Sequence, residues 1–136
     1  MSLRTAVLYS GHLYNRVMDE ASFTMAVEHV ADAHRATVVG EVDFMTAAEL
    51  DDKLSSVFDL EGPQTVEVDL SQVSFIDSTG MAALAHLHFL AAERGSRLVL
   101  LNPSTRVLRL FELTNLEEFF EIRAEPPAGA EPPTTN

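Results

Sequence analysis

The chain of 136 residues carries 21 acidic and nine basic side chains, which gives a formal net charge of −12. That length suits one domain, and a hydrophobic content of 46% is enough to bury a core. The negative charge argues against binding to nucleic-acid phosphates or to an anionic membrane surface, because both need clustered Lys and Arg. The absence of cysteine excludes disulfides, thiolate zinc sites and a cysteine nucleophile, and it agrees with a reducing, cytoplasmic location.

The two ends of the chain differ from its middle. Residues 1–20 form an N-terminal extension without the shape of a signal peptide, for which an extra strand, a helix or a loose arm are all open. Residues 125–136 hold four of the six prolines and no large apolar side chain, so they predict a disordered, acidic, proline-rich tail. Residues 21–124 are left for the folded domain, in which no apolar run approaches the roughly 20 residues that span a bilayer.

Two strands open the predicted domain. Residues 22–30 alternate in polarity and place Phe23 and Val27 on one face, as a half-buried strand requires. A polar break over residues 32–35 precedes a second strand over residues 36–44. Because the break is short, we expect the two strands to form a hairpin.

A helix is predicted next, over residues 46–60. Its apolar residues fall on one stripe with helical spacing, namely Ala47, Leu50, Leu54, Val57 and Phe58. Thr46 and Glu49 have the spacing of a capping box, which would satisfy two backbone donors at the helix start. Gly62 and Pro63 are expected to end the helix.

A strand and a helix follow, joined by a polar junction. Residues 65–70 predict the strand, and a second apolar piece over residues 73–76 comes directly after it. The residues from Asp77 to Gly80 then open a helix that runs to Gly95, where glycine is a usual C-terminal cap.

The last predicted elements are a strand over residues 97–103, a helix capped by Ser104 and a short edge strand over residues 119–122. Four consecutive apolar residues in the first of these indicate a strand that is buried on both faces. The helix breaks at Asn115. The whole order, strand-strand-helix-strand-helix-strand-helix-strand, predicts a single α/β domain.

A hydrolase is the first enzymatic alternative, with Ser78 as its nucleophile. Such a serine needs a base within hydrogen-bond reach, and the G-x-S-x-G pattern of many hydrolases is absent. His86 and His88 lie on the same predicted helix, about 12 Å or more away by helical rise. We expect a protein that is not an enzyme, and a triad through His29 or His34 is the alternative left open.

Metal and cofactor sites have weaker support. His86 and His88 are two residues apart and so point to different faces of a helix, whereas a helical metal pair is four apart. The glycine-rich phosphate loops G-x-x-x-x-G-K-[ST] and G-x-G-x-x-G are both absent. We therefore expect no metal and no cofactor.

The junction from Asp77 to Gly80 holds more polar groups than a helix start needs. One side chain suffices as an N-cap, yet Asp77, Ser78 and Thr79 are all suited to that role. Gly80 costs helix stability, and the cost is offset only where something approaches the backbone closely. The pattern predicts a surface that another molecule contacts. A plain N-cap, or a small ligand or nucleotide at the helix start, are the alternatives.

Four collinear segments carry a family resemblance. They are residues 40–43 with 46–47, residues 66–69 with 73–80, residues 95–100 and residues 103–116. In this order and spacing the chain resembles the STAS domain family, the anti-sigma factor antagonists of bacteria. The resemblance covers residues 22–122 and implies a single STAS-like α/β domain, with a mixed β-sheet and helices packed mainly on one face.

The resemblance also implies a regulatory role. In the antagonist branch, the serine after the aspartate is phosphorylated by an anti-sigma factor that is a serine kinase, and this serine corresponds to Ser78. The unphosphorylated antagonist captures the kinase, which binds the ATP, and frees the sigma factor for transcription. A phosphatase reverses the modification. The partner-binding residues implied in this way are Glu41, Asp43, Asp77, Thr79 and Gly80.

Other branches of the family leave a second function open. Family members also serve in stress-signalling assemblies, in lipid-transport complexes and as tails of anion transporters, and in such a scaffold Ser78 would not be phosphorylated. The complete D-S-T-G run favours the phosphorylated antagonist. We expect a monomer or a weak dimer that binds no nucleic acid or membrane directly.

Overall fold

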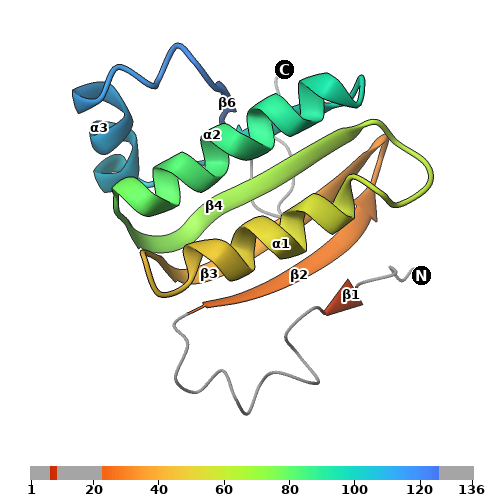
Figure 1. Cartoon of the computed structure of the whole chain (residues 1–136), viewed down its shortest axis with the longest axis horizontal. Coiled ribbons are helices and arrows are strands. Elements are labelled where there is room, and N and C mark those ends of the chain that lie inside the picture. The colour runs from red at the N-terminus through yellow and green to blue at the C-terminus, as the bar shows by residue number, and fades with distance from the viewer. Residues whose placement is uncertain (1–6, 9–22, 126–136) are drawn as a thin grey trace, which may run out of the picture.

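A six-stranded sheet and three helices make up residues 7–8 and 23–125, the part of the chain that the computed structural model describes (Figure 1). The strands are β1 (Val7–Leu8), β2 (Phe23–Val30), β3 (Ala33–Val42), β4 (Thr65–Ile76), β5 (Arg97–Leu101) and β6 (Glu121–Arg123). The helices are α1 (Ala47–Val57), α2 (Ser78–Glu93) and α3 (Thr105–Leu113). Strand order follows chain order, antiparallel from β1 to β3 and parallel from β3 to β6. The mixed α/β architecture expected from the sequence is confirmed.

Part of the N-terminal extension joins the sheet. Val7 and Leu8 pair with Val27 and Ala26 of β2, so these two residues take the first of the three forms left open for the extension, an added strand. The remainder of the extension and residue 22 lie outside the described residues.

β2 and β3 form the predicted hairpin, and its turn is tighter than the sequence indicated. The ladder leaves only Ala31 and Asp32 in the turn. β3 therefore starts at Ala33, earlier than the predicted residue 36. A polar side chain of the expected break enters the strand because it finds a partner there: Arg35 Nε donates to Oε1 of Glu67 in β4 at 2.9 Å.

α1 starts at the predicted place but without the predicted capping box. Thr46 already has a helical backbone, with φ −115° and ψ −14°, and its side chain makes no cap hydrogen bond. The hydroxyl instead donates to the Glu41 carbonyl at 2.9 Å and accepts from the Asp43 N–H at 3.0 Å. The capping-box prediction is wrong because the turn before the helix uses this hydroxyl. The helix also ends at Val57, not at residue 60.

The second half of the domain has the predicted order of strands and helices, except that two predicted strand pieces form one strand. β4 is a single strand of 12 residues where the sequence indicated two pieces, because two register shifts against β3 absorb its polar middle. α2 begins at Ser78 after an extended Asp77, and Ser104 caps α3 by accepting from the Val107 N–H at 3.2 Å. Residues 98–101 of β5 are all buried, which confirms the strand expected to be covered on both faces.

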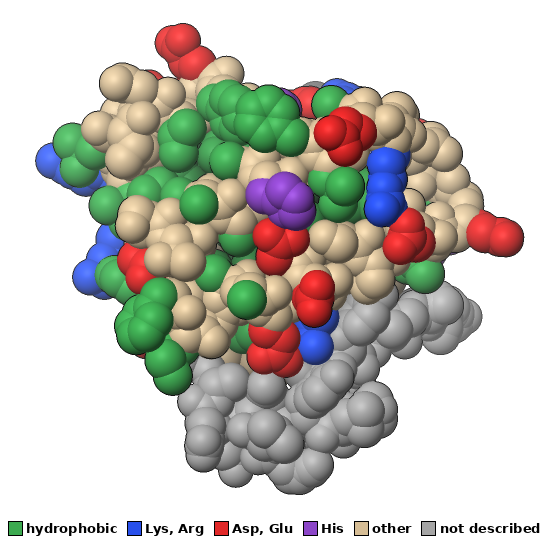
Figure 2. All heavy atoms as spheres, viewed as in Figure 1, with side chains coloured by type: hydrophobic (Ala, Val, Ile, Leu, Met, Phe, Trp, Pro, Cys, Tyr) green, Lys and Arg blue, Asp and Glu red, His purple; other side chains and the backbone are tan. Residues whose placement is uncertain are grey.

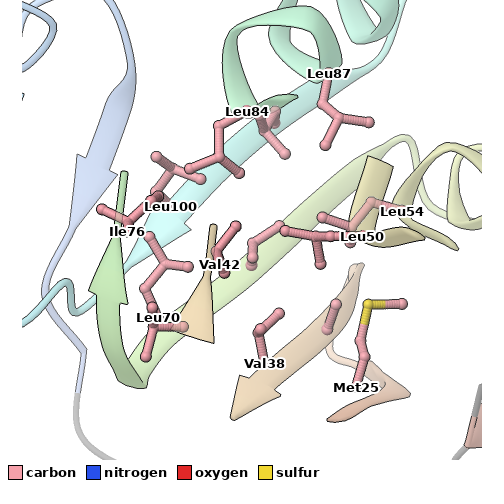
Figure 3. Packing of buried hydrophobic residues seen from close by; sticks show 14 of the residues in the cluster. Met25, Val38, Val42, Leu50, Leu54, Leu70, Ile76, Leu84, Leu87 and Leu100 are labelled. Carbon is pink, nitrogen blue, oxygen red and sulfur yellow. The ribbon is translucent and has the colours of Figure 1, made fainter. Parts of the chain in front are cut away.

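The core fills the space between the sheet and the helices (Figure 3). The sheet contributes Val38, Val42, Leu70, Ile76 and Leu100, and α1 and α2 contribute Leu50, Leu54, Leu84 and Leu87. The buried residues of α3, Val107 and Phe111, belong to the same cluster. The helices therefore pack mainly on one face of the sheet, as the family resemblance implies.

An ion-pair network lies on the opposite face, where Arg35 points because it alternates with buried Ala36. The Arg35 guanidinium contacts the carboxylates of Glu67 at 2.8 Å and Glu125 at 2.9 Å. The Glu125 N–H also donates to Oδ1 of Asn102 at 2.7 Å. The structure thus anchors Glu125 to the fold, although the sequence assigned it to the tail. The rest of that tail lies outside the described residues.

Candidate functional site

The loops that follow β3 and β4 lie side by side. The two strands are parallel neighbours and end level with each other, with Val42 opposite Ile76. The Asp77 N–H then donates to the Val42 carbonyl at 3.1 Å, which continues the contact one residue further. The turn before α1 and the start of α2 therefore form one surface at the carboxyl ends of the two strands (Figure 1).

Asp77 ties the two loops together. Its Oδ1 accepts from the Gly80 N–H at 3.0 Å and so caps α2. Its Oδ2 accepts from the Phe44 N–H at 3.1 Å, in the turn before α1. Because both carboxylate oxygens are engaged inside the protein, we assign Asp77 a positioning role at this surface.

Ser78 and Thr79 are the exposed hydroxyl side chains of the junction. Ser78 is the first residue of α2, one position after the cap. Among the residues that the structure describes, neither hydroxyl has a hydrogen-bond partner, since Asp77 supplies the capping contact. The Ser78 hydroxyl is therefore accessible and unengaged, which are the properties that a phosphate acceptor needs.

Gly80 is buried, and the structure gives its own reason for a glycine there. A Cβ at this position would lie 2.5 Å from the Val42 carbonyl oxygen and 2.8 Å from Cγ1 of both Val42 and Ile76. The close approach expected at Gly80 is thus met by Val42 of β3 and Ile76 of β4 in the same chain. We therefore assign Gly80 to the packing of α2 on the sheet, and its contact with a partner stays a prediction.

Asp43 and Glu41 lie on different sides of the sheet. Asp43 is half-buried in the turn before α1, where its Oδ1 accepts from the Met45 N–H at 2.9 Å. Glu41 precedes the buried Val42 and stands opposite the exposed Phe75, so its side chain points away from the helices. The structure brings Asp43 together with the start of α2 and places Glu41 on the reverse face.

Two exposed residues of this surface were missed by the sequence reasoning. Phe44 and Met45 in the turn before α1 are 71% and 72% exposed. Their signal in the sequence is a pair of large apolar residues in a turn, between the last strand residue, Val42, and the first helical residue, Ala47. Phe44 continues the alternation of the strand predicted over residues 36–44, but β3 ends at Val42, so the structure corrects the predicted strand end and leaves Phe44 in the turn.

The histidines considered for a catalytic triad lie far from Ser78. His29 and His34 face each other at the hairpin end of the sheet, where His34 is level with the beginning of β4. Ser78 follows the far end of β4, on the order of 30 Å away at about 3.3 Å per residue. His86 contacts α1 instead, with Nδ1 2.9 Å from Oδ2 of Asp51. No histidine in the described residues reaches Ser78, so the triad alternative is wrong.

In the described part of the chain, no three or more His, Asp and Glu residues are placed to hold a metal ion. None of its helices combines the length and the apolar character that crossing a bilayer demands.

The fold is that of a known family. The family model described as the STAS domain matches residues 25–127, which include the whole sheet from Met25 of β2 to β6 and all three helices. The chain belongs to the STAS domain family.

Individual proteins are also similar to this chain in sequence and in structure. The chain is 36% identical over 86 residues to the anti-sigma-B factor antagonist of Listeria monocytogenes, a match that covers 63% of this chain and 75% of that protein. It is 30% identical over 97 residues to the anti-sigma-B factor antagonist of Bacillus subtilis, covering 71% of this chain and 87% of that one. The crystal structure of an anti-sigma factor antagonist from Mycobacterium paratuberculosis has a TM-score of 0.65 at 26% identity, covering 79% of this chain and 88% of that one.

Proposed function

We propose that this protein is an anti-sigma factor antagonist that binds an anti-sigma factor serine kinase while Ser78 is unmodified. The observation that carries the proposal is the Ser78 hydroxyl, which is exposed and has no hydrogen-bond partner among the described residues at the start of α2. Asp77 holds the loop around it through two hydrogen bonds, so a kinase meets a preformed acceptor. The names of the relatives, anti-sigma-B factor antagonists, support the same function.

Phosphorylation of Ser78 changes the charge of this surface with little strain on the fold. A phosphoserine adds about −1.5 to −2 charges near pH 7. At the first residue of a helix, the positive end of the helix dipole stabilises such a charge by about 0.3–1 kcal/mol. The neighbouring Asp77 carboxylate already accepts from two backbone N–H groups, so the loop keeps its shape.

The phosphate lowers the stability of the complex between this chain and its partner. A partner that covers Ser78 would have to bury a dianion close to the carboxylates of Asp43 and Asp77, and buried charge without a partner is strongly unfavourable. The unmodified form therefore captures the kinase and frees the sigma factor, and the phosphorylated form releases the kinase. A phosphatase resets the switch. The kinase binds the ATP, and this chain acts in the cytoplasm as a regulator of transcription with no catalytic step of its own.

The test is phosphate transfer from the kinase of the source bacterium, purified by following its ATP-dependent modification of this chain. We expect one phosphate on the peptide that contains Ser78 and none on the Ser78→Ala variant. Thr79→Ala is the matched control, because it removes the neighbouring exposed hydroxyl, and it should accept phosphate as the wild type does. Mass spectrometry of the intact protein and its peptides gives both the stoichiometry and the site.

Two results would contradict the proposal. Full phosphorylation of Ser78→Ala would place the acceptor elsewhere in the chain. The absence of any kinase that modifies the wild-type protein would favour the scaffold or lipid-transport branch of the family, in which Ser78 has no modified form.

A further inference from the structure

Two histidines face each other across the hairpin of β2 and β3. His29 and His34 are directly opposite in the strand register, so their Cβ atoms lie about 4.5–5.5 Å apart on the same face of the sheet. Their ring centroids are 5.5 Å apart, with 38° between the ring planes. The hairpin and the loop that follows α1 lie at one end of the sheet, and α2 begins at the other end (Figure 1).

A ring nitrogen of His34 is buried and has no partner. His34 is only 6% exposed, and its Nε2 makes no hydrogen bond in the part of the chain that the structure describes. Buried polar atoms in native proteins nearly always have a partner, so this nitrogen requires an explanation. Burial lowers the pKa of the His34 imidazole, which keeps the ring neutral near pH 7. The neutral imidazole is the form that coordinates metal ions.

Gly62 leaves space next to this nitrogen. A Cβ on Gly62 would lie 3.9 Å from Nε2 of His34 and, apart from the two adjacent residues, within 4 Å of no other heavy atom of the described residues. The φ of Gly62 is +107°, a backbone conformation that favours glycine over residues with a side chain. Nε2 of His34 therefore borders on space that a side chain would otherwise fill.

The separation of the two rings suits a shared metal ion. Two imidazoles that bind one zinc ion at about 2.0–2.1 Å per nitrogen have ring centres roughly 5–6 Å apart. The 5.5 Å between His29 and His34 falls in this range. Imidazole is a preferred ligand of zinc, copper and nickel, and a net charge of −12 on the chain favours the binding of a cation.

We propose that His29 and His34 together bind one zinc ion or a similar divalent transition-metal ion, with water at the remaining positions. The bound ion links β2 to β3 and stabilises the folded chain, in which the two rings are already close. The pair lies on the order of 30 Å from Ser78 along β4, so this site is separate from the proposed function. The pair is not visible as a site in the sequence, because the two histidines are brought together by the hairpin register.

The test is calorimetric titration of the full chain with zinc chloride at pH 7.5. We expect one zinc ion per chain, bound at least tenfold more weakly by His29→Ala and by His34→Gln. His29 is exposed, so His29→Ala removes a ligand without opening the core, and His34→Gln keeps a polar side chain of similar size. His86→Ala is the matched control on α2, and His12→Ala is the control outside the described residues. Both should change the affinity less than twofold.

A second measurement separates coordination by imidazole from general attraction. Figure 2 shows acidic side chains over the face that carries α1 and α2, and such carboxylates attract any divalent cation weakly. Magnesium is the control ion, because it prefers oxygen ligands to imidazole. Zinc should raise the melting temperature of the wild type by several degrees, and magnesium at the same concentration should leave it unchanged. Zinc should have no such effect on His29→Ala.

The outcomes decide between a site and an adventitious ion only. Loss of zinc affinity in both His29→Ala and His34→Gln, with both controls unchanged, supports the proposed site. Equal zinc affinity of the wild type and His29→Ala, or equal stabilisation by magnesium, would overturn it. Neither result bears on phosphate transfer to Ser78, which tests the proposed function by itself.

Discussion

Neighbouring residues in the D-S-T-G run have different roles. Asp77 accepts from two backbone N–H groups, Ser78 is exposed at the start of α2, and Gly80 is buried against β3. In the proposed function this loop acts through the exposed Ser78 hydroxyl, while Asp77 and Gly80 hold the helix in place. Substitutions at these positions should therefore separate stability from binding.

Gly80→Ala should destabilise the protein. Its new Cβ would meet the Val42 carbonyl oxygen at 2.5 Å, and a backbone atom in a sheet cannot move aside easily. We expect the free energy of unfolding to fall by about 1–2 kcal/mol, even though alanine favours a helix over glycine by about 1 kcal/mol. Urea denaturation measures this, with Ser78→Ala as a control at an exposed position of the same turn. An unchanged midpoint for Gly80→Ala would contradict the packing role.

His34 should make stability depend on pH. Burial lowers the pKa of this imidazole below its ordinary value of 6.5, and the positive charge of His29 lowers the pKa further, whereas the backbone of Glu61 raises it. The unfolded chain therefore binds a proton at this side chain near pH 6.5, whereas His34 of the folded protein binds it only at a lower pH. Below that pH the free energy of unfolding falls, by up to about 1.4 kcal/mol per pH unit, until the folded-state pKa is passed.

The measurement for His34 is a set of urea midpoints at pH 7.5, 6.5 and 5.5. His34→Gln should flatten the decline between pH 6.5 and 5.5, since glutamine has no proton to gain. A variant that declines as steeply as the wild type would show that another group causes the pH dependence.

At the scale of elements, the turn between β3 and α1 is held from both sides. The Thr46 hydroxyl bonds to Glu41 and Asp43 within the turn, and Asp77 bonds to Phe44 from the neighbouring loop. This arrangement fixes the exposed side chains of the turn relative to the start of α2. The parallel pairing of β3 with β4 makes it possible, because it brings the two loops to one edge of the sheet.

Thr46→Val should loosen this turn. Valine has nearly the same shape but no hydroxyl, so the Asp43 N–H and the Glu41 carbonyl lose a partner at a site that is only 1% exposed. We expect a loss of about 1–2 kcal/mol in the free energy of unfolding and faster amide hydrogen exchange in residues 43–46. Thr46→Ser keeps the hydroxyl and should remain close to the wild type. Equal exchange in both variants would contradict the role of this hydroxyl.

The sequence predicts most of the elements because their signals are local. Alternation, helical stripes and breaks at glycine or asparagine place the strands and helices within a few residues. The role of the Thr46 hydroxyl, the close contact of Gly80 and the reverse-face position of Glu41 could not be predicted in this way. Each depends on how β3 pairs with β4, and the two strands are separated in the chain by α1.

At the scale of the whole molecule, the two faces of the sheet differ. The helices, the core and the Ser78 loop lie on one face, and the network around Arg35, Glu67 and Glu125 lies on the other. The carboxylates of Asp43 and Asp77 lie in the two loops of the Ser78 surface, so this surface carries negative charge before any phosphate is added. A modification there should therefore act on binding far more than on folding.

Ser78→Asp should reproduce part of that effect. One added carboxylate next to Asp77 carries less charge than a phosphate, so we expect roughly tenfold weaker binding to the kinase with the melting temperature unchanged. Ser78→Ala should bind as the wild type does, because it adds no charge. Calorimetric titration of both variants is the check, and equal affinities for the two would show that charge at this position does not control the complex.

The most direct test of the central claim compares the same chain before and after phosphorylation at Ser78. The purified kinase is titrated into unmodified protein and into protein that carries one phosphate, with the modification verified by mass. We predict a tight complex with the unmodified protein, a complex at least 100-fold weaker with the phosphorylated one, and recovery of the tight complex after phosphatase treatment. Equal affinity of the kinase for both forms would contradict the account.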